Sequence, residues 1–207
     1  MTSKNPVLLF EGEFGRQVAL RLATRVPEVA IHPFGEATAN FAKAILGAGF
    51  ILVALGRRRP TLCDALDKAC RSARVPWSAA VLESVELFSG PVVVPDGPCY
   101  SCFRRRLRSH WMIPARESAW ERALESADTE SQGSGFPPAA AQLAAVNLAM
   151  DMRDGEAAAG RLRIVNLIHL GVEEERVVRV HNCERCGRER GSRRFVDDLA
   201  RELDGWL

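Results

Sequence analysis

The stretch "VLLFEGEFGRQVALRLA", residues 7–23, decides the fold. It opens with four apolar residues, continues with glycines at positions 12 and 15, and ends with apolar residues at helical spacing. This order predicts a short buried strand, a tight turn and a helix. Nucleotide-binding α/β folds begin with the same three pieces, so the stretch favours a Rossmann-like fold.

The alternation of strands and helices continues up to Leu82. We predict strands over 28–34, 50–55 and 75–82, and helices over 36–49 and 61–74, the second capped by Thr61. Strands that alternate with helices favour parallel pairing and a sheet with helices on both faces, the doubly wound pattern.

The pattern changes after Leu82, where glycine and proline interrupt the apolar alternation. Residues 84–98 suit two edge strands or a hairpin, and residues 128–138 form a polar loop that we expect to be disordered or gated. The remaining elements expected are helices on either side of Pro114 over 102–127, an alanine-rich helix over 139–154, and strands over 162–170 and 175–187.

Two identical Cys-x-x-Cys units are the strongest chemical signal in the chain. Cys99 and Cys102 form the first unit, and Cys183 and Cys186 form the second. Such a turn can direct both sulfurs at one ion about 2.3 Å away, and two turns complete a tetrahedral zinc site without an open position. The spacing therefore predicts a structural zinc ion, with redox-active dithiols and unligated thiols as the alternatives.

The remaining cysteines and the arginines near the units have simpler interpretations. Cys63 and Cys70 lie in a predicted helix and are expected to fill core space. We expect the arginines to balance the negative charge of the zinc-bound thiolates; a solvated helix face and the docking of an acidic peptide or phosphate backbone remain open. The arginines concerned are Arg104, Arg105, Arg106, Arg185 and Arg188.

The glycine turn itself departs from a working phosphate cradle. Phe10 takes the place of the first glycine of G-x-G-x-x-G, and Glu11 and Glu13 add negative charge that would repel a phosphate. We therefore expect a degenerate nucleotide loop at Gly12 and Gly15, without cofactor binding.

The length and composition favour one domain. The 207 residues are 47% hydrophobic and carry a formal net charge of +2, which excludes strong attraction of the whole molecule to nucleic acid or membranes. No apolar run approaches the roughly 20 residues that span a bilayer, and no secretory signal is recognisable, so we expect a cytoplasmic protein. We expect a single domain over 1–207, with an α/β part (6–95), a zinc-clasped part with a helical insertion (96–190) and an amphipathic helix (191–207).

The chain resembles the ThiF/MoeB class of enzymes that activate ubiquitin-like proteins. Residues 7–23 are similar to the opening "V-L-V-V-G-x-G-G-L-G-S" of that class, which also has two later Cys-x-x-Cys pairs that hold a structural zinc. The segment "LFSGPVVVPDGPCYSCFRRRLRSH", residues 87–110, resembles a degenerate branch of the class, the C-proteins of azoline-forming cyclodehydratases. These proteins, also called TOMM precursor leader peptide-binding proteins, are partners of YcaO-family enzymes. The resemblance covers roughly residues 6–187.

The resemblance implies a ThiF/MoeB-type fold with a four-cysteine zinc site, and the departures from it bear on catalysis. Activating enzymes hold magnesium with an aspartate after the third strand, where this chain has Ala54 followed by Arg57–Arg59. We therefore expect no catalytic residues, and Cys63 and Cys70 do not supply a thioester nucleophile. The family's usual N-terminal winged-helix peptide clamp is also missing before Val7, so we expect either that another subunit supplies it or that this chain is purely a scaffold.

These observations predict a non-catalytic partner subunit in a complex that modifies ribosomally made peptides. We expect a YcaO-family enzyme or related subunit as its partner, a precursor peptide contacted directly or indirectly, and a homodimer or hetero-oligomer built through the alanine-rich and C-terminal helices. The alternatives are an adenylating enzyme with an altered nucleotide loop, and a zinc-containing nucleic-acid-binding protein that uses Arg104–Arg108 and Arg188–Arg194.

The histidines and three tryptophans carry no catalytic pattern. We expect His32, His110, His169 and His181 to be packed or surface residues. For His110 and His181, near the cysteine units, a place beside the zinc ligands or a role as substitute ligands is the alternative. Trp111, Trp120 and Trp206 are expected to anchor the core or an interface.

Overall fold

The computed structural model describes residues 5–34, 41–110, 112–126 and 135–187. Strand β1 (Val7–Glu11) is almost wholly buried, and helix α1 (Gly12–Ala23) begins at the next residue. Gly12 has a φ of 69°, a conformation that favours glycine. A Cβ on Gly15 would lie 2.7 Å from the carbonyl oxygen of Ala54, so this glycine lets α1 pack closely on the sheet.

Seven strands form one sheet in the order β2-β1-β3-β4-β5-β6-β7. The first four strands pair in parallel, and they are β1, β2 (Ala30–Pro33), β3 (Ile51–Leu55) and β4 (Trp77–Glu83). The others pair antiparallel, and they are β5 (Glu86–Ser89), β6 (Arg161–Asn166) and β7 (Val172–Arg176). The predicted mixed α/β fold is confirmed, with parallel pairing confined to β1–β4.

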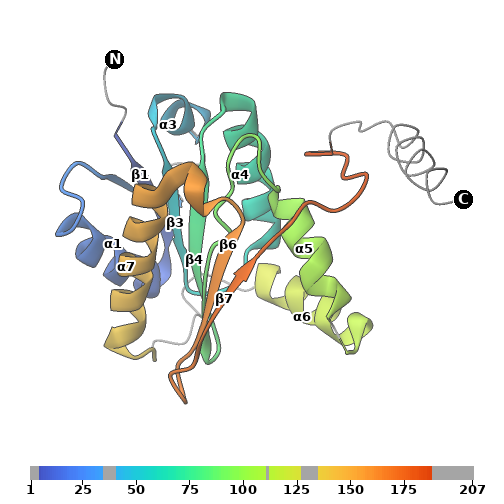
Figure 1. Cartoon of the computed structure of the whole chain (residues 1–207). Coiled ribbons are helices and arrows are strands. Elements are labelled where there is room, and N and C mark those ends of the chain that lie inside the picture. The colour runs from blue at the N-terminus through green and yellow to red at the C-terminus, as the bar shows by residue number, and fades with distance from the viewer. Residues whose placement is uncertain (1–4, 35–40, 111, 127–134, 188–207) are drawn as a thin grey trace, which may run out of the picture.

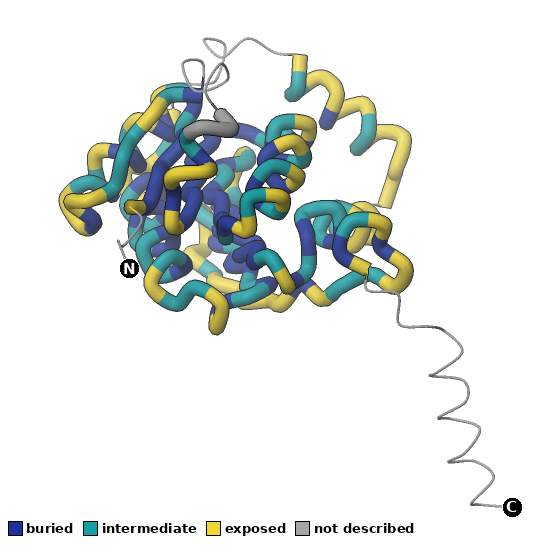
Figure 2. The backbone as a smooth tube through the Cα atoms, turned by 90° about the horizontal axis from the view of Figure 1, so that it is seen from above, coloured by how far each residue is buried: buried dark blue, intermediate teal, exposed yellow. Residues whose placement is uncertain are grey.

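Helices lie against both faces of the sheet (Figure 1). On one face α1 and α7 (Pro138–Asp154) pack together, and on the other lie α3 (Phe41–Gly47) and α4 (Pro60–Ala73). Helices α5 (Tyr100–Ser109) and α6 (Pro114–Ser126) follow beyond α4, and the short 3-10 helix η2 (Gly155–Ala158) follows α7. Figure 2 shows buried segments gathered in the middle and exposed ones at the periphery.

Helix α7 corrects one prediction. Its alanine face does not serve as an association surface, because Ala140, Ala141, Ala144 and Ala145 are completely buried against α1 and the sheet. Small side chains let two helices approach closely on one face of a sheet. The other helix that we predicted for association, 191–207, lies outside the described residues, as does most of the predicted loop 128–138.

Three local predictions also change. Thr61 does not cap α4, because Arg59 is the N-cap residue, Pro60 occupies the first helical position and no side chain caps the end. Residues 84–98 contribute β5, which forms a hairpin with β4 but lies inside the sheet rather than at its edge. The last predicted strand, 175–187, begins earlier and ends at Arg176, so turns rather than a strand hold the second cysteine unit.

Among the described residues, no helix combines the length and apolar character that a membrane span requires.

Candidate metal centre

The four cysteines of the two Cys-x-x-Cys units lie together and are buried. All four sulfur atoms lie within 4.8 Å of one another. The Sγ–Sγ distances are 3.7 Å from Cys99 to Cys102, 3.5 Å from Cys99 to Cys183 and 3.3 Å from Cys102 to Cys186. A tetrahedral ion with metal–sulfur bonds of about 2.3 Å requires sulfurs about 3.8 Å apart, whereas a disulfide requires about 2.05 Å. The cluster therefore has the spacing of a metal site and could hold a metal ion.

The first unit is built at the start of α5. Cys99 is the N-cap residue of this helix, and its carbonyl oxygen accepts a hydrogen bond from the backbone N–H of Cys102 at 3.0 Å. The N-terminal end of a helix carries partial positive charge, which favours ionised thiols there. The "GP" that precedes the unit also fits the local packing, because a Cβ on Gly97 would lie 2.6 Å from the Val94 side chain.

The second unit follows β7 in a tight turn. The N–H of Cys183 donates to the Val180 carbonyl at 3.2 Å, and the N–H of Gly187 donates to the Cys183 carbonyl at 2.6 Å. A Cβ on Gly187 would lie only 2.4 Å from that carbonyl oxygen, so the turn requires glycine. The N–H of Val180 also donates to the Cys102 sulfur at 3.3 Å, which joins the two units.

The surroundings of the sulfurs shift thiol pKa values in opposite directions within the cluster. Burial raises the pKa of Cys99 well above its ordinary value and that of Cys186 to about 11. Burial also opposes ionisation of Cys183, but the backbone N–H groups of Cys186 and Arg185 lower its pKa to about 6. A divalent cation at the centre would stabilise the ionised form of all four sulfurs at neutral pH.

Arg185, between the two cysteines of the second unit, fastens that unit to α4. Its guanidinium donates to both carboxylate oxygens of Asp64, at 2.7 and 3.0 Å, and to Asp67 at 2.8 Å. Asp67 is completely buried and also accepts a hydrogen bond from the indole of Trp77 at 3.3 Å. The second unit is thus connected to the core by a continuous polar network.

Three of the arginines near the cysteines contact protein groups other than the sulfurs. Arg185 pairs with the two aspartates of α4, and Arg104 pairs with Glu121 of α6 at 2.7 Å. Arg106 donates to the carbonyls of Val178 and Arg179, so it holds the chain between β7 and the second unit. Two of these arginines thus have carboxylate partners, and their expected balancing of thiolate charge stays a prediction; Arg105 is exposed, and Arg188 lies outside the described residues.

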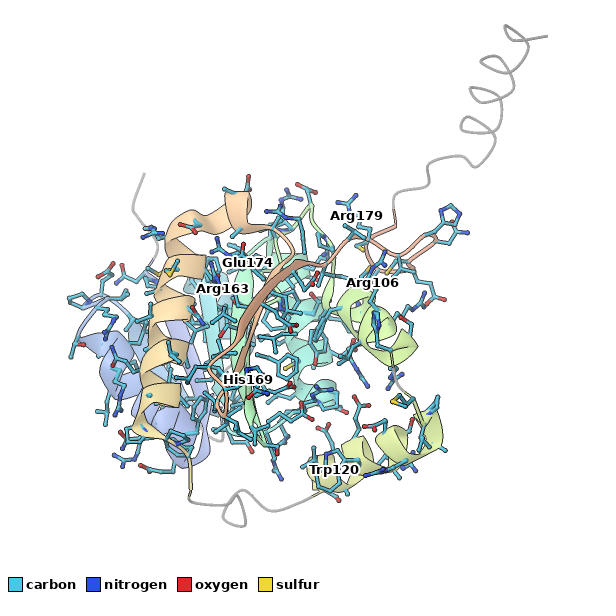
Figure 3. The ribbon with its side chains drawn as sticks, turned by 60° about the horizontal axis from the view of Figure 1, so that its bottom comes forward. Arg106, Trp120, Arg163, His169, Glu174 and Arg179 are labelled. Atoms are coloured by element: carbon cyan, nitrogen blue, oxygen red, sulfur yellow. The ribbon has the colours of Figure 1, made fainter. Side chains whose placement is uncertain are left out.

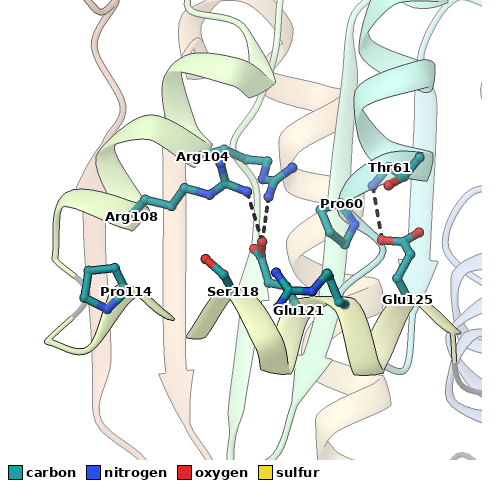
Figure 4. A pocket seen from close by; sticks show the side chains of 9 residues that line it. Pro60, Thr61, Arg104, Arg108, Pro114, Ser118, Glu121 and Glu125 are labelled. Atoms are coloured by element: carbon teal, nitrogen blue, oxygen red, sulfur yellow. Dashed lines mark hydrogen bonds and ion pairs between the residues drawn. The ribbon is translucent and has the colours of Figure 1, made fainter. Parts of the chain in front are cut away.

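Helix α6 is held to the rest of the structure through polar contacts. Glu121 accepts hydrogen bonds from Arg104 and from Arg108, at 2.7 and 3.1 Å, and Glu125 accepts one from the backbone N–H of Thr61 at 3.3 Å (Figure 4). These residues line a cavity of about 410 Å³ between α4, α5 and α6. Glu121 is the one buried residue of α6.

The glycine turn is filled by an ion-pair network. The Glu11 carboxylate, 8% exposed, lies 2.5 Å from Nη1 of Arg59 and 3.4 Å from Nη2 of Arg57. Arg59 also lies 3.5 Å from Glu125. Glu13, in contrast, is exposed and pairs with Arg16 at 2.7 Å. Both predicted acidic residues of the turn thus have arginine partners, and those of Glu11 come from the segment after β3.

The remaining candidates lie away from the cluster or on the surface. Cys63 and Cys70 are buried in the core, and burial raises the pKa of Cys63 to about 12, which agrees with their predicted packing role. His32, His110, His169 and His181 are exposed, and Trp120 is 57% exposed on α6. Trp111 and Trp206 lie outside the described residues.

Sequence reasoning missed the acidic partners, which are Asp64, Asp67 and Glu121. Asp64 and Asp67 are three residues apart in a helix, so they share a face, and Asp67 falls among the apolar positions of that face. A charged residue at a core position of a predicted helix was the available signal for a buried partner.

The comparisons with known proteins support the fold. No model of a protein family matches the chain, and no curated protein matches its sequence. The heterocyclase TruD is similar in structure, with a TM-score of 0.62 and 18% identity over 89% of this chain and 28% of TruD. A heterocyclase solved in complex with substrate and cofactor gives a TM-score of 0.59 and 16% identity over 89% of this chain and 25% of its own length.

Escherichia coli MccB has the same fold over more of its length. Its TM-score is 0.58, with 13% identity over 89% of this chain and 66% of MccB, and another MccB structure contains AMPCPP and MccA. At these identities the likeness establishes a shared fold. The chain spans about a quarter of the length of the two heterocyclases and about two-thirds of MccB.

Proposed function

We propose that this chain is a partner subunit, without adenylation chemistry of its own, in a complex that forms azoline rings in ribosomally made peptides. In this role it helps to present a precursor peptide to a YcaO-family enzyme. Two features support the proposal: the fold shared with the heterocyclases, and the resemblance of residues 87–110 to the C-proteins of cyclodehydratases.

The ion-pair network beside the glycine turn is the observation that argues most strongly against adenylation by this chain. A phosphate at the start of α1 requires free backbone N–H groups and unpaired positive charge. Here the buried carboxylate of Glu11 already engages Arg57 and Arg59, and it would repel a second anion. Gly15 is needed for the contact between α1 and β3 and does not by itself indicate a nucleotide site.

The proposal includes a structural zinc ion held by Cys99, Cys102, Cys183 and Cys186. The donor set fits zinc, because four thiolates at tetrahedral spacing prefer it and leave no position for substrate or water. When bound, the ion would join the start of α5 to the turn after β7. Its contribution is to folding, and none of the described residues near the cluster is assigned a chemical step.

Three measurements test the function. The full chain should copurify with the YcaO-family enzyme encoded beside it, and deletion of its gene should abolish or reduce azoline formation in the precursor peptide. The isolated chain should catalyse no ATP–pyrophosphate exchange. Absence of both the association and the deletion phenotype would overturn the partner role.

Adenylation is the second candidate, because MccB has the same fold and has been solved with AMPCPP. Exchange activity in the isolated chain that is lost in the Arg57→Ala variant would establish this alternative. The nucleic-acid alternative is not favoured in the described part of the chain, since Arg104, Arg106 and Arg108 all have protein partners.

A further inference from the structure

Strand β7 borders an open groove at the edge of the sheet. All five residues of β7 are exposed, and its outer edge pairs with no other strand in the described part of the chain. The groove, about 850 Å³, lies between β5–β7 and the helices α5 and α6. An unpaired strand edge beside a groove is the arrangement to which extended peptides add as a further strand.

The sheet register defines the sides of this groove. Glu173 pairs with Ile164 and Glu175 pairs with Leu162, so both glutamates share a sheet face with these two apolar side chains. All four line the groove. The apolar lining is completed from the sheet and from the helical side by Phe88, Val177, Phe103, Leu107, Met112 and Ile113.

Glu174 points to the other side of the sheet. It pairs in register with Arg163 and accepts a hydrogen bond from that guanidinium at 3.0 Å (Figure 3). The three consecutive glutamates of β7 therefore lie on opposite faces of the sheet. Arg163 of β6 neutralises Glu174, whereas Glu173 and Glu175 line the groove. Neither Glu173 nor Glu175 forms an ion pair with any residue that the structure describes.

Five glutamates and four arginines line the groove, which gives it a formal excess of one negative charge. Of its arginines, Arg58 pairs with Glu83, Arg106 donates to two carbonyls, and Arg176 donates to the Ala159 carbonyl. Arg116 is followed in the chain by the opposite charge of Glu117, and both line the groove. Among the described residues, the acidic side chains of the groove that form no ion pair are those of Glu86, Glu117, Glu173 and Glu175.

This charge pattern selects the occupant. Antiparallel pairing of β7 with β7 of a second copy would place glutamates opposite glutamates, which destabilises a sheet edge. An added strand with lysine or arginine at alternate positions would instead place each basic side chain beside Glu173 or Glu175. Charged side chains alone can protect a strand edge from pairing with other chains. Met112 and Ile113, which are 96% and 53% exposed, add apolar surface to the groove, and such protection does not require it.

We propose that the β7 edge and its groove bind an extended peptide segment in which basic residues alternate with apolar ones, as an added strand. The inference rests on the proposed function for the identity of that segment, which would belong to the precursor peptide. It gives the chain a direct peptide contact in place of an indirect one.

Fluorescence anisotropy of the full chain with a labelled, acetylated peptide that alternates lysine with valine tests the proposal. The double variant Glu173→Lys/Glu175→Lys should weaken binding by about tenfold or more and should bind the matching glutamate–valine peptide instead. The control Glu28→Lys/Glu156→Lys changes the net charge equally at exposed positions that do not line the groove and should bind like the wild type. Equal loss in both double variants, or no binding by the wild type, overturns the proposal.

Backbone methylation separates strand addition from simple charge attraction. Successive amides of a strand point to opposite sides, so N-methylation of every second residue should abolish binding in one register and spare it in the other. Equal affinity of the two methylated peptides overturns strand addition. If the chain copurifies with a YcaO-family enzyme but binds no peptide, this inference fails alone; if it binds the peptide without copurification, the proposed function fails alone.

Discussion

Individual cysteines contribute unequally to this structure. The sulfurs of Cys99, Cys102, Cys183 and Cys186 meet at one point, whereas Cys70 is a buried core residue. We expect Cys99→Ser and Cys183→Ser each to release the metal and to lower the unfolding temperature. Structural zinc contributes on the order of 10 kcal/mol in small sites. Because the cluster joins only α5 to the turn after β7, we expect the lower unfolding temperature as an early partial transition of that region, ahead of the main transition.

Metal content by elemental analysis and thermal unfolding by circular dichroism measure both effects. Cys70→Ser is the matched control, because it introduces the same polar change in the core without touching the cluster, and it should retain the metal. Full metal content in either cluster variant would contradict the assignment.

Glu11 and Glu13 provide a second contrast between neighbouring residues. Replacement of Glu11 by alanine leaves Arg57, whose side chain is 7% exposed, without its described partner. We expect Glu11→Ala to lower the free energy of unfolding by at least about 2 kcal/mol. Glu13→Ala should cause a much smaller loss, since the Glu13–Arg16 pair is exposed to solvent. Chemical denaturation measures both, and equal losses would contradict the structural role of Glu11.

The metal-site residues could be predicted from the sequence, but their supports could not. Cys-x-x-Cys spacing is a local property that fixes where two sulfurs can point, so it survives without knowledge of the fold. The partners of Arg185 lie 121 and 118 residues away, on α4, and only tertiary packing brings them together. The same holds for Glu11 with Arg57 and Arg59, which meet because β1 and β3 are neighbours in the sheet.

Helix α6 depends on ion pairs rather than on apolar burial. Its one buried residue, Glu121, accepts hydrogen bonds from Arg104 and Arg108 of α5. We expect Glu121→Ala to speed amide hydrogen exchange in α6 by about tenfold or more while exchange in α1 and β3 stays unchanged. Glu117→Ala, a change at a half-buried position of the same helix that forms no ion pair with the described residues, should leave the exchange of α6 unaltered. Exchange measured by mass spectrometry distinguishes the two, and identical profiles would contradict the ion-pair attachment.

Helix α7 depends on small side chains. Ala144 is completely buried where α7 meets α1 and β4, so a larger residue has no space there. We expect Ala144→Leu to lower the free energy of unfolding by about 1–3 kcal/mol through overpacking. Ala139→Leu changes an exposed position at the start of the same helix and should have little effect. Denaturant titrations of both variants measure these free energies. An unchanged free energy of unfolding in Ala144→Leu would mean that this face of α7 is open to a partner.

How well the helices and strands could be predicted depends on how clear their apolar sequence pattern is. Buried parallel strands such as β3 are short continuous apolar runs between helices, and their positions were predicted to within a few residues. Strand β7 reads "VEEER", which has no apolar alternation, and its strand conformation comes from pairing with β6. The alanines of α7 gave no such signal either, because only the neighbouring α1 makes their face a buried one.

At the scale of the whole molecule, the residues that the structure describes form three apolar clusters of different character. One lies under α1 and α7 and another under α3 and α4, and both are built on β1–β4. The third is smaller and contains all four cysteines together with Phe88, Leu162 and Val177. A metal ion would therefore secure the smallest of the three clusters, and the groove beside β7 shares Phe88, Leu162 and Val177 with it.

Removal of the metal should accordingly loosen one region rather than the entire chain. After chelation, we expect amide hydrogen exchange to rise strongly in α5 and in residues 177–187, because cross-linking by the ion no longer holds the two units together. Strands β1 and β3 should keep their protection, since the two apolar clusters to which they belong contain none of the four cysteines of the candidate metal site. Exchange by mass spectrometry before and after chelation, with restoration on addition of zinc, measures this. A uniform rise across the chain would mean that the cluster governs global folding, and no change in α5 would mean that the sulfurs hold no ion.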